Sequence, residues 1–390
     1  MHDVGLTETQ QMIRHTIRDY VTREIEPLVP ALEAETLLPY EPIRKMVRTL
    51  GLGATGEIAQ LIAESPPEEQ LKRFVPRILT IEISRVCAGM ASALAVTTGL
   101  AGANIRRQGT PEQVERWAEP LMRLEKVGSW CLTEPQAGSA ALRDMKTTAV
   151  RDGDCFVLNG SKTFISNAPY ADTFVVYAKL RQNGAESIQG FILERGDAGL
   201  TTGPPFKKMG FKASPTGEVF LDDCRIPVDR LLGGNREKRP NVKQSLASER
   251  VGLQAISYGI MERAFEIALK YARERQQGGR VIGDYQLIQR RLTRMYVALA
   301  NARAFVFGDL QGRGDRAFSP ADASAGKLYV AEMATFMAIE AMHILGGNGY
   351  MEEYVVERLV RDAKLIELAG GTTEMQELTT GKWLMANYEV

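Results

Sequence analysis

The middle of the chain reads GDCFVLNG (153–160), DTFVVYAKL (172–180), IQGFILE (188–194) and EVFLDDCRI (218–226). These short runs are rich in β-branched and aromatic residues, and glycine, asparagine and aspartate turns separate them. Such a pattern is typical of strands joined by tight turns. It predicts an all-β region of roughly six to eight strands.

Helical periodicity surrounds this β region on both sides. Apolar residues after Thr7 recur at helical spacing, and Thr7 with Gln10 resembles a capping box. The stretch from about Leu79 to Gln108 is rich in Ala, Leu, Ile and Val, which predicts a helix that is buried on most sides. Pro111 is expected in the first turn of the next helix. Further helices are expected near 242–275, 284–311, 319–346, 352–362 and 372–388.

The order helical, β, helical predicts an α+β multi-domain protein. We expect an N-terminal α-helical domain (1–124), a middle β-barrel or sandwich domain (125–232) and a C-terminal four-helix bundle (233–390). A chain of 390 residues is long enough for two or three such units.

Composition narrows the class of protein. Hydrophobic residues make up 44% and charged residues 25%, which are ordinary values for a soluble globular protein. Lys+Arg and Asp+Glu both number 48, so no nucleic-acid partner is expected. Four separated cysteines without a CxxC pair predict neither a metal site nor disulfides. Without a targeting pattern or a long apolar run, we expect a cytoplasmic protein that does not enter a membrane.

Four motifs carry a family resemblance. They read WCLTEPQAGS (130–139), NGSKTFISN (159–167), LGGNGY (345–350) and AGGTTEMQ (369–376). In this order and spacing they resemble the acyl-CoA dehydrogenase family, from about residue 80 onward. The resemblance implies an FAD flavoprotein of fatty acid metabolism that oxidises an acyl-CoA to the trans-2-enoyl-CoA. It also implies an electron-transferring flavoprotein as acceptor, and a homotetramer built as a dimer of dimers.

The resemblance also implies which residues bind the flavin ring. Thr133 matches a threonine that hydrogen-bonds the pyrimidine side of the ring. Phe164 and Ser166 match an aromatic residue against the flavin and a hydroxyl near its N5 atom. The flavin or the acyl pocket would be lined by Trp130, Cys131 and Leu132, and Ser139 would face the pantetheine arm of the substrate.

The dinucleotide end of FAD is, by resemblance, held across a subunit interface. Arg275 matches the arginine that pairs with the pyrophosphate, a role suited to a bidentate donor. This chain departs from the family at one nearby position. Gly278 stands where the family has an aromatic residue near the flavin of the neighbouring subunit. The remaining contacts would come from His343, Leu345, Gly346, Gly347, Thr372, Glu374 and Gln376.

The catalytic base is inferred from two positions together. Many family members carry it as the glutamate of a Tyr-Glu-Gly-Thr segment, but the matching residue here is Gly370. The isovaleryl and long-chain branches place the glutamate on an earlier helix, directly before an arginine, and Glu249 and Arg250 match that pair. A lone Glu-Arg pair on a helix is usually a surface pair of little consequence. Because a glutamate is present at 249 and absent at 370, the two positions together favour a base instead.

The resemblance therefore implies a division of roles. Glu249 would abstract the α proton, the flavin N5 would take the β hydride, and the N–H of Gly370 would polarise the thioester carbonyl. Arg250 would belong to the substrate site. Ala91 stands where the glutaryl branch has an arginine for a distal carboxylate, which disfavours a dicarboxylic acyl group.

Other functions stay open at this stage. The same residues could run an enoyl thioester reduction or serve a substrate attached to an acyl carrier protein. A flavin oxidase or monooxygenase of the same fold gains some weight from Gly278. A non-catalytic flavoprotein is the alternative from another class.

Overall fold

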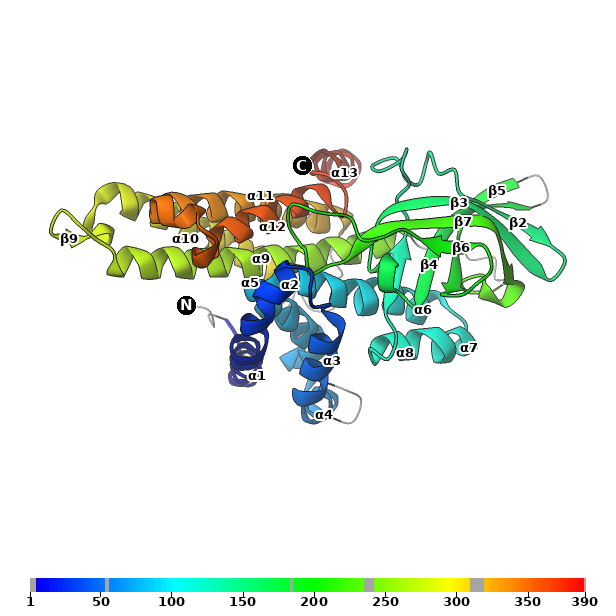
Figure 1. Ribbon diagram of the computed structural model, residues 1–390, viewed down its shortest axis with the longest axis horizontal. Coiled ribbons are helices and arrows are strands. Elements are labelled where there is room, and N and C mark those ends of the chain that lie inside the picture. Colours follow the sequence, from blue (N-terminus) through cyan, green and yellow to red (C-terminus); the bar gives the residue numbers. More distant parts are fainter. Residues whose placement is uncertain (1–4, 53–55, 183–184, 235–241, 309–318, 389–390) are drawn as a thin grey trace.

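The computed structural model describes residues 5–52, 56–182, 185–234, 242–308 and 319–388. Figure 1 shows an elongated molecule, with a helical bundle at one end and a curled sheet at the other. The predicted fold class is confirmed, since helical N-terminal and C-terminal parts enclose the sheet in the sequence.

The N-terminal part is helical as expected. The Thr7 hydroxyl accepts from the Gln10 N–H while the Gln10 side chain accepts from the Thr7 N–H, so the predicted capping box is present. Pro111 occupies the first turn of its helix. The helices are α1 (Glu8–Tyr20), α2 (Val29–Glu33), α3 (Tyr40–Thr49), α4 (Glu57–Glu64), α5 (Leu71–Ala95), α6 (Ala103–Gln108), α7 (Pro111–Gln113) and α8 (Glu119–Met122).

The middle part forms a seven-stranded sheet, within the predicted range. The strands run in the order β1-β4-β2-β3-β7-β6, and β5 pairs with β4. The long strands β3 and β7 are antiparallel, with register shifts between Leu158 and Gly160 and between Lys162 and Ile165. The strands are β1 (Gly128–Cys131), β2 (Thr148–Asp152), β3 (Cys155–Ser166), β4 (Thr173–Gln182), β5 (Ala185–Glu194), β6 (Leu200–Thr202) and β7 (Thr216–Pro227).

The C-terminal part is a bundle of four helices that α13 crosses at the end nearest the sheet (Figure 1). Its helices approach closely, since a Cβ built on Gly326 would lie 2.7 Å from Oε1 of Gln254. The elements are α9 (Val242–Glu274), β8 (Gln276–Gln277), β9 (Arg280–Val281), α10 (Gln286–Phe307), α11 (Pro320–Leu345), α12 (Val356–Leu368) and α13 (Thr373–Asn387).

One hydrophobic core joins the two helical parts, because α5 and α9 pack against each other. Two helical stretches, Leu71–Gln108 and Ala321–Tyr350, are long and apolar enough to cross a membrane. In both, half or more of the most apolar window is buried inside the protein (61% and 50%). Burial in the helical core accounts for their composition.

A buried network of charges ties the two helical parts together. The Arg14 side chain on α1 lies 2.7 Å from the carboxylate of Glu82 on α5 and 2.5 Å from that of Glu262 on α9. All three side chains are fully buried. Arg85 on α5 extends the network to Glu266, at 2.5 Å. The carboxylates raise the pKa of Arg14 against the opposing effect of its burial.

Replacing Arg14 by methionine should destabilise the helical parts by about 3–5 kcal/mol, because two buried carboxylates lose their fully buried cation and keep only Arg18 and Arg85. Urea denaturation followed by far-UV circular dichroism measures the effect. Lys45→Met is the control, since its pair with Glu24 is exposed and should contribute little. Equal stability of both variants would contradict the role given to the network.

Candidate active site

The turn after β1 is fixed by a buried acidic residue that the sequence analysis did not single out. The carboxylate of Glu134 accepts hydrogen bonds from Lys162 Nζ at 2.8 Å, from the Thr147 N–H at 2.9 Å and from the Lys146 N–H at 2.6 Å. Burial alone would raise the pKa of Glu134, but these donors hold it below its usual value. This set of hydrogen bonds, the Glu134 clamp, fixes the backbone that carries Thr133.

Thr133 lies directly before Glu134 in this turn. Its carbonyl accepts from the Thr163 N–H at 3.0 Å, which joins the turn to β3. The Lys162 ammonium also donates to the carbonyl of Leu132, at 3.2 Å. Thr133 is partly exposed while Trp130 and Leu132 are buried, so the threonine side chain is available to a ligand.

Phe164 has an unusual position for an aromatic residue. Its φ is 56°, in the left-handed region, and its side chain is 70% exposed. Strain of this kind is concentrated at binding sites. The neighbouring Asn167 is fully buried and donates to the carbonyls of Ala93 and Gly128, both at 3.0 Å. The end of β3 is thereby held with Phe164 facing outward and Ser166 beside it.

Gly370 and Glu249 meet at the sheet-proximal end of the bundle. A Cβ built on Gly370 would lie 3.7 Å from the carboxyl carbon of Glu249 and would overlap Cδ1 of Leu253. Gly370 also has a φ of 64°. A side chain at this position is thus disfavoured by space and by backbone conformation. The structure brings together the two positions whose exchange the sequence analysis noted.

Two cations surround this contact. Arg250 donates from Nη1 to the Ser324 hydroxyl on α11, at 2.9 Å. Lys327, one turn further along α11, is buried and donates from Nζ to the carbonyl of Gly371 at 2.8 Å. Lys327 was missed by the sequence analysis. The available signal was a lone charge in the small and apolar run ASAGKLYVA (323–331).

The electrostatic setting of Glu249 suits a proton acceptor. Burial raises the pKa of its carboxyl to about 7, although Arg250 and Lys327 oppose the shift. Burial lowers the pKa of Lys327 to about 8, so Lys327 is mostly protonated at neutral pH. A carboxyl that titrates near neutrality is a candidate general base.

The other predicted residues lie elsewhere. Ser139 is exposed in the turn after β1. Arg275 is exposed beside the β8–β9 hairpin, at the end of the bundle farthest from the sheet (Figure 1). The loop after α11 reaches the same end, since the Asn348 amide donates to the Tyr271 hydroxyl at 2.9 Å. This end also holds His343, Leu345, Gly346 and Gly347. One chain therefore does not bring these residues to Thr133 and Phe164.

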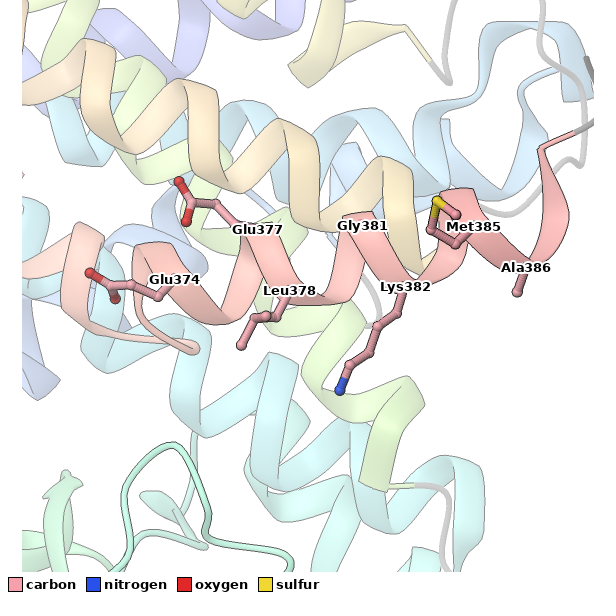
Figure 2. A pocket seen from close by; sticks show the side chains of 7 residues that line it. All are labelled: Glu374, Glu377, Leu378, Gly381, Lys382, Met385 and Ala386. Atoms are coloured by element: carbon pink, nitrogen blue, oxygen red, sulfur yellow. The ribbon is translucent and has the colours of Figure 1, made fainter.

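The segment after Gly371 leads into α13. Gln376 is fully buried, and its amide donates to the carbonyls of Gly370 at 3.1 Å and Gly371 at 2.8 Å. Its Oε1 atom has no partner among the residues that the structure describes. An open hollow of about 690 Å³ follows one side of α13 (Figure 2). Its lining residues are Glu374, Glu377, Leu378, Gly381, Lys382, Met385 and Ala386.

The raised pKa of Glu249 predicts a pH-dependent effect on stability. The folded protein holds this proton up to about pH 7, whereas the unfolded chain releases it near pH 4.5, so stability falls as the pH rises from about 4.5 to about 7. Glu249→Gln should stabilise the protein on the order of 1–3 kcal/mol at pH 8 and have little effect at pH 5. Thermal melting at both pH values measures this. A stabilisation that is independent of pH would contradict the shift.

The three parts of the chain match the domains of a known family. The sequence profiles of the acyl-CoA dehydrogenase N-terminal, middle and C-terminal domains match residues 7–125, 129–224 and 240–385. A relative from Clostridium acetobutylicum, "Acyl-CoA dehydrogenase, short-chain specific", is 33% identical and covers 96% of this chain and 98% of its own length.

Solved structures give the same result. Butyryl-CoA dehydrogenase from Megasphaera elsdenii has a TM-score of 0.87 at 30% identity, covering 98% of this chain and 99% of its own. The prolyl acyl carrier protein oxidase AnaB has a TM-score of 0.85 at 27% identity, covering 97% and 100%. Other similar chains have been solved with FAD or FADH2 bound, which supports FAD as the cofactor. The chain thus belongs to the acyl-CoA dehydrogenase family, whose members oxidise CH–CH bonds.

Proposed function

We propose that this protein catalyses FAD-dependent α,β-dehydrogenation of an acyl-CoA thioester, with Glu249 as the base. The observation that carries the proposal is the contact between the Glu249 carboxyl and Gly370, where a Cβ would lie 3.7 Å from the carboxyl carbon. The carboxylate that other members supply from the turn comes here from α9. Only one of the two positions carries a carboxylate, so no second acid competes for the α proton.

The residues present fit a bound FAD. Phe164 offers an exposed ring from a strained backbone position, and Thr133 is fixed by the Glu134 clamp. The buried Oε1 atom of Gln376 has no partner in the described part of the chain. The bound flavin supplies the hydride acceptor. Thr133, Phe164 and Ser166 would hold its ring, and Trp130 and Leu132 would form the wall behind it.

The chain's own residues handle the proton and the carbonyl. Glu249, with its pKa near 7, is partly ionised at neutral pH and can accept the α proton. The N–H of Gly370 would donate to the thioester carbonyl, where negative charge develops. Arg250 would keep this end of α9 in register with α11 through Ser324. Ser139 would meet the pantetheine arm.

A short acyl chain is the preferred substrate class. The Clostridium acetobutylicum relative is named as short-chain specific and the Megasphaera elsdenii structure as a butyryl-CoA dehydrogenase. Ala91, at the matching position on α5, is buried and offers no cation for a distal carboxylate. We therefore infer a short monocarboxylic acyl group. Electron-transferring flavoprotein is the proposed acceptor.

The separation of the two ends of the bundle supports a site shared between subunits. The β8–β9 hairpin, which directly follows Arg275, lies at the opposite end of the molecule from β3, which carries Phe164 (Figure 1). His343 is also engaged locally, because Arg291 Nη1 lies 3.2 Å from its Nδ1 and 2.7 Å from Glu340 Oε2. We propose that these residues contact the dinucleotide end of FAD bound to a partner subunit, in a tetramer built as a dimer of dimers.

Glu249→Gln should leave FAD bound and slow reduction of the flavin by butyryl-CoA by at least about 10³-fold, because the α proton loses its acceptor. Anaerobic stopped-flow absorbance of the oxidised flavin band measures the rate. The matched control is Glu367→Gln, whose carboxylate pairs with Lys364 outside the proposed proton path. Near-normal reduction by the Glu249 variant would refute the base assignment.

Arg275→Ala should weaken retention of FAD, since a charge-assisted contact to the pyrophosphate is lost. The flavin-to-protein ratio after extended dialysis is the measurement. Arg273→Ala is the control, because Arg273 is equally exposed two residues earlier on α9. Full FAD occupancy of the Arg275 variant would count against the pyrophosphate role.

An oxidase is the second candidate, and one feature of the structure favours it. Gly278 has a φ of 60°, and a Cβ there would lie 2.7 Å from the Tyr285 hydroxyl. The positive φ at this position favours glycine, and without the family's aromatic side chain the hairpin would leave the neighbouring flavin less covered. Similarity to the prolyl acyl carrier protein oxidase points the same way. Rapid reoxidation of the reduced flavin by O2 would favour an oxidase over the dehydrogenase.

A further inference from the structure

The glycine turn beside Glu249 is held by a buried lysine from another helix. Lys327 is 1% exposed and donates from Nζ to two carbonyls, that of Gly371 at 2.8 Å and that of Glu367 at 3.2 Å. The first follows Gly370 in the chain, and the second belongs to the last turn of α12. A lysine at a helix C-terminus is favoured by the helix dipole. The two bonds fix where the turn leaves α12.

The lysine also faces the proposed base. Lys327 and Glu249 influence each other's ionisation, each favouring the charged form of the other. Both side chains reach the same turn, because Lys327 Nζ lies 2.8 Å from the Gly371 carbonyl oxygen and a Cβ on Gly370 would lie 3.7 Å from the Glu249 carboxyl carbon. A buried ammonium costs free energy unless it is well paired, so its retention here calls for a reason beyond packing.

We propose that Lys327 is a positioning residue for the reaction, which holds the Gly370–Gly371 turn in place and keeps a positive charge beside Glu249. The inference rests on the proposed function, in which Glu249 is the base and the Gly370 N–H meets the thioester carbonyl. Without the lysine the carboxyl would remain protonated to higher pH, and the turn would lose the cation that ties it to α11.

The other charges around the pair are few. Glu249 is faced by Arg250 from its own helix and by Lys327 from α11, while the turn 369–372 carries no titratable side chain. Lys327 is faced by Glu249 and Arg250 on α9, by Glu367 on α12 and by Glu374 on α13. The Glu367 carboxylate is itself occupied, by Lys364 at 2.6 Å and the Thr335 hydroxyl at 2.5 Å. Among the described residues, Lys327 is therefore one of two cations that lower the pKa of the base.

Infrared difference titration of the FAD-loaded protein tests this directly. The absorption band of the protonated Glu249 carboxyl is identified by its absence in Glu249→Gln. The titration midpoint is the pH at which half of this band is lost. Lys327→Met should move that midpoint upward by roughly one unit. A shift from about 7 to about 8 lowers the ionised fraction at pH 7 from one half to about one tenth, so flavin reduction should slow about five-fold there.

Three further variants separate charge from geometry. Lys327→Gln keeps a donor for the carbonyls but no charge, so its midpoint should also rise, and it carries the test if the methionine variant does not fold. Lys327→Arg keeps the charge and should keep the midpoint. Lys364→Met removes an exposed cation from the same end of α12 and should leave the midpoint unchanged.

The outcomes distinguish this inference from the proposed function. An unchanged midpoint in Lys327→Met and Lys327→Gln would overturn the role of the lysine, whatever the turnover rate. Normal flavin reduction by Glu249→Gln would instead overturn the base assignment, because the infrared midpoint does not depend on turnover.

Discussion

The packing of α9 against its neighbours is the constraint on which the rest of the molecule depends. This helix of 33 residues contacts α5 on one side and α10, α11 and α12 on the other. It contributes Glu262 to the buried charge network and Glu249 to the candidate site. Because both acidic residues sit on one rigid element, the position of the site relative to the core is fixed by the same contacts that stabilise the fold.

The candidate site shows how a partly buried carboxylate can be balanced between its charged and neutral forms. Burial raises the pKa of Glu249, while Arg250 and Lys327 limit the rise, so the group titrates near neutrality. The cation Arg14 in the core has the opposite setting, because fully buried carboxylates on two helices keep it charged. The difference is one of pairing. Arg14 is bound directly by its partners, and Glu249 is only influenced by its neighbours.

The sheet contributes rigidity rather than titratable chemistry. The Glu134–Lys162 pair is almost fully buried, and the donors around Glu134 lie on two separate segments. This arrangement explains why the turn after β1 can expose Thr133 without loosening. The buried Asn167 likewise fixes the end of β3, which carries Phe164 with its positive φ. Two buried polar groups thus support the partly exposed Thr133 and the exposed Phe164.

The sequence by itself determined the order of helical and β regions, the capping box at Thr7 and the family, because these follow from periodicity and from motifs of fixed spacing. By resemblance, it also linked the acidic residue at 249 with the glycine at 370 as a paired exchange. Only the tertiary structure decided that they touch, since 121 positions apart they meet through the packing of α9 and the turn before α13.

Lys327 and Glu134 escaped sequence reasoning for the same reason. A lysine in an apolar helix and a glutamate before a proline have no distinctive pattern, and their roles come from partners that are distant in the chain. The separation of Arg275 from Phe164 was likewise decided by the length of the bundle (Figure 1). Local pattern determines which element forms, whereas the site depends on long-range contacts that no single segment encodes.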